Sequence, residues 1–162
     1  MNKNTNPEVA TGNEVGGNIL SLFSVIAVKA LTLAQAKARE SQHGYVGLEH
    51  ILWAALKLER TALQEEGDVL PLPFPVSAVN AVEQVLEREN ISHPSNTEKP
   101  LRWTPRGKKV LAIALRISAK KPVPLSALVR ACLMEKEHQA VQAAFNEAAS
   151  MLDSVRKQMG VE

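Results

Sequence analysis

Cysteine is nearly absent from this sequence: Cys132 is the only one among 162 residues, so no internal disulfide can form. Aromatic residues are also scarce, at 4% of the chain, while alanine and leucine are abundant, which favours closely packed helices over a β-sandwich. No apolar run approaches the length of about 20 residues that a membrane-spanning helix needs. The first 18 residues are polar and lack the apolar core of a signal peptide. We therefore expect a cytoplasmic protein.

The residue patterns of common catalytic and metal sites are missing as well. No Gly-x-x-x-x-Gly-Lys-Ser/Thr loop is present to cradle a nucleotide phosphate. The four histidines, His43, His50, His93 and His138, are too scattered for a zinc-binding pattern, and one cysteine cannot supply the other ligands. Cys132 falls on an apolar helical stripe, where we expect a buried and inert thiol. The sequence therefore predicts a protein that is not an enzyme and that has no catalytic residue, metal or cofactor.

Apolar residues recur at helical spacing along most of the chain, and no convincing segment alternates with the period of two that a strand requires. The pattern predicts an all-α fold. Residues 1–20 lack this periodicity and are expected to form a disordered tail. Helices are predicted at 24–42, from about residue 47, at 60–66 and at 76–90. Further helices are predicted from Thr104 as N-cap with Pro105 in the first turn, after Pro124, at 138–148 and at 150–159.

The second half of the chain repeats the first. An offset of 80 residues pairs Phe23 with Trp103 and Ser24 with Thr104, and an offset of 77 pairs Val46 with Val123. We predict two four-helix repeats, at about 22–90 and 102–159, joined by a linker at 91–101. Each repeat has an apolar face, so the two should pack with pseudo-twofold symmetry into one compact eight-helix domain over residues 21–162.

Two short motifs carry a resemblance to a known family. The first opens the second repeat and reads Trp103-Thr104-Pro105-Arg106-Gly107-Lys108-Lys109. The second lies in the first repeat and consists of His43, Tyr45, Val46, Gly47, Glu49 and His50. Both resemble the repeat pattern of the Clp N-terminal domain, the substrate- and adaptor-docking module of Clp-type protein-unfolding ATPases. The resemblance extends over about residues 22–159.

The resemblance implies a non-catalytic protein-binding module. Because no nucleotide loop is present, we expect a stand-alone form that acts as an accessory or adaptor in Clp-dependent proteolysis or remodelling. Its partner would be a Clp-type ATPase, a protease component or a client protein. The second repeat departs from the family pattern, since Pro124-Leu125-Ser126-Ala127 replaces Gly-Thr-Glu-His.

Six residues are candidates for partner contact, mostly apolar or aromatic side chains that could line a groove between helices or repeats. They are Phe23, Tyr45, Leu48, Glu49, Trp53 and Trp103. Phe23 and Trp103 could instead be core residues, whereas Trp53 is expected to be exposed. By resemblance, Glu49 could bind a guanidinium group such as that of phosphoarginine. The alternative is a carboxylate in the first helical turn that stabilises its own helix.

A basic segment supports an alternative function. Between residues 99 and 134 the chain has nine lysines or arginines and no acidic residue. Several of these basic residues could share one helical face and follow a phosphate backbone; the stretch comprises Arg102, Arg106, Lys108, Lys109, Arg116, Lys120 and Lys121. The alternative function is therefore that of a small basic helical protein that binds nucleic acid.

Overall fold

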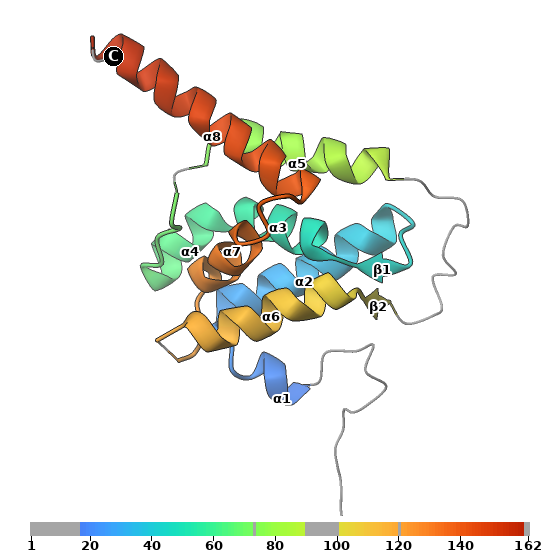
Figure 1. Ribbon diagram of the computed structural model, residues 1–162. Helices are drawn as coiled ribbons and strands as arrows, with labels where there is room; N and C mark the ends of the chain where they lie inside the picture. The colour runs from blue at the N-terminus through green and yellow to red at the C-terminus, as the bar shows by residue number, and fades with distance from the viewer. Residues whose placement is uncertain (1–16, 73, 90–100, 120, 161–162) are drawn as a thin grey trace, which may run out of the picture.

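A computed structural model describes residues 17–72, 74–89, 101–119 and 121–160. The protein is mostly helical, with one two-stranded sheet (Figure 1). The elements are α1 (Gly17–Leu20), α2 (Val25–Glu40), β1 (Tyr45–Val46), α3 (Leu48–Lys57), α4 (Glu59–Glu66), α5 (Val76–Arg88), β2 (Arg102–Trp103), α6 (Pro105–Ile117), α7 (Leu125–Leu133) and α8 (Gln139–Gln158). The predicted helical class is confirmed. Most of the predicted linker lies outside the described residues, and so does His93.

The helix starts follow from local capping chemistry. Ser24 precedes α2 and its hydroxyl accepts a hydrogen bond from the backbone N–H of Ala27. Thr104 precedes α6 in the same way and accepts from the N–H of Gly107 at 2.9 Å, with Pro105 in the first turn. These groups satisfy backbone donors that a helix start leaves without partners. The predicted cap at Thr104 is confirmed, and Ser24, its pseudo-equivalent in the first half, caps α2 in the same way.

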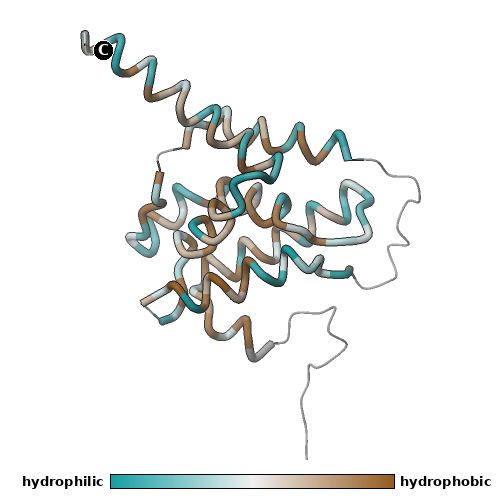
Figure 2. The backbone as a smooth tube through the Cα atoms, viewed as in Figure 1, coloured by the Kyte–Doolittle hydropathy of each residue, from teal (hydrophilic) through white to brown (hydrophobic). Residues whose placement is uncertain are grey.

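Helix α3 lies at the centre of the molecule, and its residues 48–56 are all buried. It contacts α2, α5 and α7, and α8 packs along α5 (Figure 1). A helix that is covered on every side is apolar on every side, and this segment has no charged residue between Glu49 and Lys57. In Figure 2 the connection between α7 and α8 is hydrophilic, in contrast to the largely apolar α7 that precedes it.

The two repeats exchange backbone hydrogen bonds at two equivalent places. Val46 pairs with Trp103 in the parallel β1–β2 sheet, and Phe23 pairs with Val123 in an isolated parallel bridge. Next to the β1–β2 sheet, the N–H of Thr104 donates to the carbonyl of Val46 at 3.0 Å. Next to the isolated bridge, the N–H of Ser24 donates to the carbonyl of Val123 at 2.8 Å. The residues paired by the sequence offsets therefore hold equivalent positions in the two contacts.

The expected division into four helices per repeat is wrong in the second repeat. There α8 is one continuous helix instead of two, because the sequence around Ser150 has no helix breaker and serine inside a helix costs only about 0.5 kcal/mol. Residues 134–138 connect α7 to α8 directly, and a link of that length leaves no room for a counterpart of α4. The expectation of a disordered tail is wrong for residues 17–20, which form α1.

Two carboxylates cap helices from a distance. Glu66 at the end of α4 accepts a hydrogen bond from the N–H of Ile26 at 3.1 Å. Asp68, just beyond α4, accepts from the N–H of Ser126 at 2.9 Å, in the first turn of α7. Helix α7 starts after Pro124 and has no side-chain cap of its own. The segment that ends α4 therefore ties the starts of α2 and α7 together.

Candidate functional site

The turn from β1 into α3 depends on a glycine. A Cβ atom at Gly47 would lie 2.5 Å from Oε1 of Glu49 and 3.4 Å from Oγ1 of Thr104, so a larger residue would displace the carboxylate. The Gly47 N–H donates to Nδ1 of His50 at 3.0 Å, which closes the first turn of α3. The glycine thus lets the Glu49 side chain fold back beside the second repeat.

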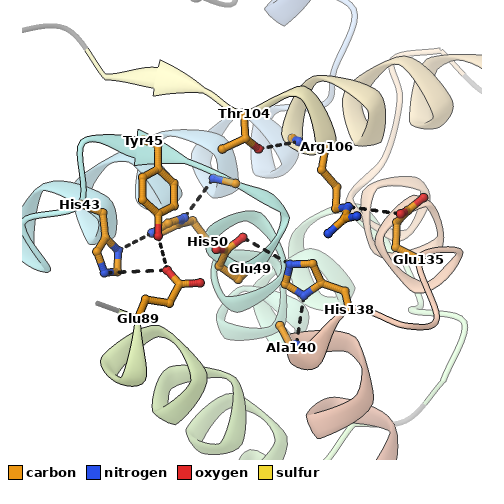
Figure 3. A network of polar contacts seen from close by, with 12 residues as sticks. His43, Tyr45, Glu49, His50, Glu89, Thr104, Arg106, Glu135, His138 and Ala140 are labelled. Carbon is orange, nitrogen blue, oxygen red and sulfur yellow. Dashed lines mark hydrogen bonds and ion pairs between the residues drawn. The ribbon is translucent and has the colours of Figure 1, made fainter. Parts of the chain in front are cut away.

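The buried histidines form a relay with fixed proton positions (Figure 3). Because Nδ1 of His50 accepts from Gly47, Nε2 of His50 carries the proton and donates to Nδ1 of His43 at 2.8 Å. Nε2 of His43 must then carry its own proton; it lies 3.8 Å from Oε1 of Glu89 and has no hydrogen-bond partner. Burial lowers the pKa of His43, and it lowers the pKa of His50 to about 4. Both rings are therefore neutral at pH 7.

A carboxyl pair continues this network. Glu89, which follows α5, accepts a hydrogen bond from the Tyr45 hydroxyl at 2.5 Å. Its pKa is raised to about 8, first by burial and then by its hydrogen bond with Glu49. Burial alone would raise the pKa of Glu49, but hydrogen bonds from His138, Glu89 and its own backbone hold it well below the usual range. The pair therefore shares one proton at neutral pH, with Glu49 ionised and Glu89 protonated.

His138 links this pair to the second repeat. It is the N-cap of α8, where its Nδ1 accepts from the N–H of Ala140 at 3.1 Å. Its Nε2 therefore carries the proton and points at Oε1 of Glu49 from 3.6 Å. The Glu49 carboxylate is thus occupied inside the chain by His138 and Glu89 (Figure 3).

The fold brings together a group that the histidine spacing did not predict. Ligand atoms of His43, His50 and Glu89 lie within 4.8 Å of one another. A metal ion on Nε2 of His50 would require a proton on Nδ1, which would then face the Gly47 N–H, donor against donor. A metal ion on Nε2 of His43 would likewise require a proton on Nδ1 of His43. That proton would face the Nε2–H of His50, which donates to Nδ1 of His43 in the relay. This group fits a hydrogen-bond relay and does not fit a metal site.

Beside His138 the surface forms a hollow of about 420 Å³, which we call the α6/α8 hollow. It is lined by Arg106, Met134, Glu135, Lys136, Glu137 and His138. Glu135 pairs with two bases of α6, at 3.4 Å from Nε of Arg106 and 3.0 Å from Nζ of Lys109. Met134 is 53% exposed. The hollow therefore combines both signs of charge with one accessible apolar side chain, a composition suited to a polypeptide segment.

The six predicted contact residues are mostly inside the molecule. Phe23, Leu48 and Trp103 are core residues. Trp53 is only 6% exposed, so the expectation of an exposed Trp53 is wrong. Its Nε1–H donates to Glu83 at 3.2 Å, and two lysine ammonium groups lie over its ring. Tyr45 is half-buried and Glu49 is buried, both within the network described above.

Sequence reasoning did not identify the hollow. The sequence feature that could have indicated the hollow is the charged segment 134–138, which follows the apolar helix at 125–133. The basic segment is less available to a phosphate backbone than the sequence suggested, because Arg106 and Lys109 both pair with Glu135, which offsets part of their positive charge. Lys120 lies outside the described residues.

Parallel backbone pairing joins the two halves of this mostly helical fold at two places. The comparison with protein families gives the particular assignment. The chain belongs to the Clp repeat (R) N-terminal domain family, whose model matches residues 22–123. Domains of this family are non-catalytic protein-interaction modules. No curated protein matches the sequence. Among the described helices, none has the length and apolarity needed to cross a membrane.

Proposed function

We propose that this chain is a non-catalytic Clp-type binding module that works as a cytoplasmic adaptor or accessory. It docks a Clp-type ATPase, a protease component or a client protein. One observation carries this proposal: the α6/α8 hollow is an open site at the start of α6, next to the Glu49–His138 contact that joins the repeats. Family membership supports the binding role, and the hollow supplies a place for it.

The contacts in the hollow favour a charged polypeptide segment. Arg106 and Lys109 have side chains that are more than half exposed, so a partner carboxylate can reach them beside Glu135. Met134 offers an apolar anchor at the same rim. The two ion pairs of Glu135 are at the surface and contribute little to stability, and the Met134 side chain is flexible. All three groups can therefore form contacts with a partner at little energetic cost.

Glu49 has a positioning role in this proposal. To bind a guanidinium group of a partner, its carboxylate would have to leave both His138 and Glu89. The arrangement supports the alternative in which Glu49 stabilises the start of α3 and holds His138 at the edge of the hollow. The three core residues among the predicted contacts contribute to binding only by stabilising the fold, because they are buried: Phe23, Leu48 and Trp103.

A photo-crosslinking residue in place of Met134 tests the proposal. Leu63 on α4 is the matched control, because it is 52% exposed and does not line the hollow. In native lysate we expect the Met134 position to capture a Clp-type ATPase, a protease component or a client, and the Leu63 position to capture none of these. Equal capture at both positions, or capture of nucleic-acid-binding complexes that nuclease releases, would contradict the proposal.

A further inference from the structure

The Glu49 carboxylate is held by two side-chain donors that come from different helices. The Nε2–H of His138 points at Oε1 of Glu49 from 3.6 Å at the start of α8, and protonated Glu89 donates to the same carboxylate from the end of α5 (Figure 3). The Glu49 side chain is only 10% exposed. A buried carboxylate that loses its donors carries the full cost of desolvation. Either donor can therefore leave Glu49 while the other stays, but both cannot leave together.

His138 is the donor that a partner can reach. It lines the α6/α8 hollow, and its side chain is 13% exposed. Its Nδ1 accepts from the Ala140 N–H, so Nε2–H is the one donor that the neutral ring offers. At 3.6 Å the contact with Glu49 is long, so the ring is held loosely. A partner carbonyl or carboxylate that accepts this N–H takes it from Glu49, and Glu49 then depends on the proton of Glu89.

Glu89 has hydrogen-bonding groups suited to both of its protonation states. In the protonated state it donates to Glu49. In the ionised state it repels Glu49, and two donors then face its Oε1. The Tyr45 hydroxyl donates at 2.5 Å, and the Nε2–H of His43, which is buried and has no hydrogen-bond partner, lies 3.8 Å away. Loss of the proton therefore turns Glu89 from Glu49 towards His43.

Besides His138, the described groups that act on these two carboxyls keep a constant charge between pH 7 and pH 9. Burial lowers the pKa of two histidines and raises the pKa of a tyrosine and of a cysteine on α7, so all four stay neutral. They are His43, His50, Tyr45 and Cys132, and the cation Lys37 of α2 acts on the two histidines. Burial and the neighbouring Glu49 raise the pKa of Glu89 to about 8. The change of charge just above neutral pH is therefore that of Glu89.

We propose that the proton on Glu89 is a switch that decides whether His138 is free to bind a partner in the α6/α8 hollow. This inference rests on the proposed function, because it concerns the regulation of the same site. With the proton in place, His138 can leave Glu49 at little cost. Without it, Glu49 needs the His138 N–H, and the hollow loses that donor. At pH 9 only about one tenth of the molecules carry the proton, so the apparent affinity for a partner should be about tenfold lower than at pH 7.

Nitrogen-15 NMR of the histidine rings in the full chain tests the switch without a partner. Between pH 7 and pH 9.5 we expect the Nε2 signals of His43 and His138 to shift with a common midpoint of about 8, because one ring gains a hydrogen bond and the other strengthens its bond. In Glu89→Gln both profiles should be flat, since the amide donates to Glu49 at every pH. Glu87→Gln, at an exposed position of α5, is the matched control and should keep the midpoint. Flat wild-type profiles, or a His138 midpoint that survives Glu89→Gln, would overturn the proposal.

Photo-crosslinking from position 134 then measures the effect of the switch on binding. At subsaturating partner, capture from native lysate should fall about tenfold from pH 7 to pH 9 in the wild type and in Glu87→Gln, and should stay constant in Glu89→Gln. Wild-type capture that is equal at the two pH values, or a fall that Glu89→Gln does not remove, would also overturn the switch. No capture at either pH, beside coupled NMR shifts, would contradict the proposed function and leave the switch itself supported.

Discussion

Replacing Gly107 by alanine tests how closely the two repeats approach. Gly107 lies in the first turn of α6, and a Cβ atom there would meet the Val46 carbonyl oxygen at 3.0 Å and Oγ1 of Thr104 at 3.2 Å. The Val46 carbonyl cannot move freely, because it accepts the Thr104 N–H at 3.0 Å in the bridge between repeats. The added methyl group must therefore push α6 away from β1.

Whether Gly107→Ala stabilises or destabilises the protein depends on the gain in helix propensity and the cost of overpacking. Alanine is favoured over glycine inside a helix by about 1 kcal/mol, which is an upper limit for the gain in a first turn. Overpacking costs about 1–3 kcal/mol, and a weakened backbone hydrogen bond costs about 1 kcal/mol more. We expect Gly107→Ala to lower the free energy of unfolding by about 1–3 kcal/mol, measured by urea denaturation with an unchanged slope. Ala112→Gly, at an exposed position of the same helix, calibrates the propensity effect. A Gly107→Ala protein as stable as the wild type would refute the close approach of the repeats.

Three further predictions follow from the network and the caps. His50 has a folded-state pKa of about 4, below its unfolded value of 6.5, so its contribution to stability is complete above pH 6.5 and is lost as the pH falls through 4. In a Glu89→Gln background, which removes a titration of opposite sign, urea denaturation should show a loss of about 2 kcal/mol between pH 7 and pH 5; a flat profile would contradict the neutral relay. Asp68→Ala should destabilise the protein by about 1 kcal/mol and Asp68→Asn by less, because asparagine keeps an acceptor for the Ser126 N–H; equal losses in thermal unfolding would rule out that cap. Nucleic-acid binding, measured by fluorescence anisotropy at physiological salt, should be no tighter than about 1 μM, and nanomolar binding would favour the alternative function.

Local chemistry made part of the fold predictable. Ser24 and Thr104 are strong N-caps at matching positions, and their spacing located both repeats. The same local rules could not divide the second repeat correctly, because Ser150 is compatible with both a boundary and a continuous helix. The burial of Trp53 did have a signal: the segment after Glu49 is apolar on every side, which is typical of a central helix.

The site was harder to predict, because its members come from distant parts of the chain. His43 and His50 are only seven residues apart in the sequence. Glu89, which lies close to His43, follows α5, and His138, which contacts Glu49, starts α8. No local pattern links these positions. The tautomers also depend on single backbone N–H groups, at Gly47 and Ala140, which only the folded geometry reveals. Sequence therefore predicted the family and not the contacts.

The central claim is that a protein partner binds at the α6/α8 hollow, and hydrogen exchange of the complex with its captured partner tests this most directly. We expect slower amide exchange on binding in residues 106–109, at the start of α6, and in residues 134–138, because Arg106 and residues 134–138 line the hollow. Residues 59–66 of α4, on a separate exposed surface, should exchange at an unchanged rate. Protection confined to α4, or to any surface other than the hollow, would contradict the account.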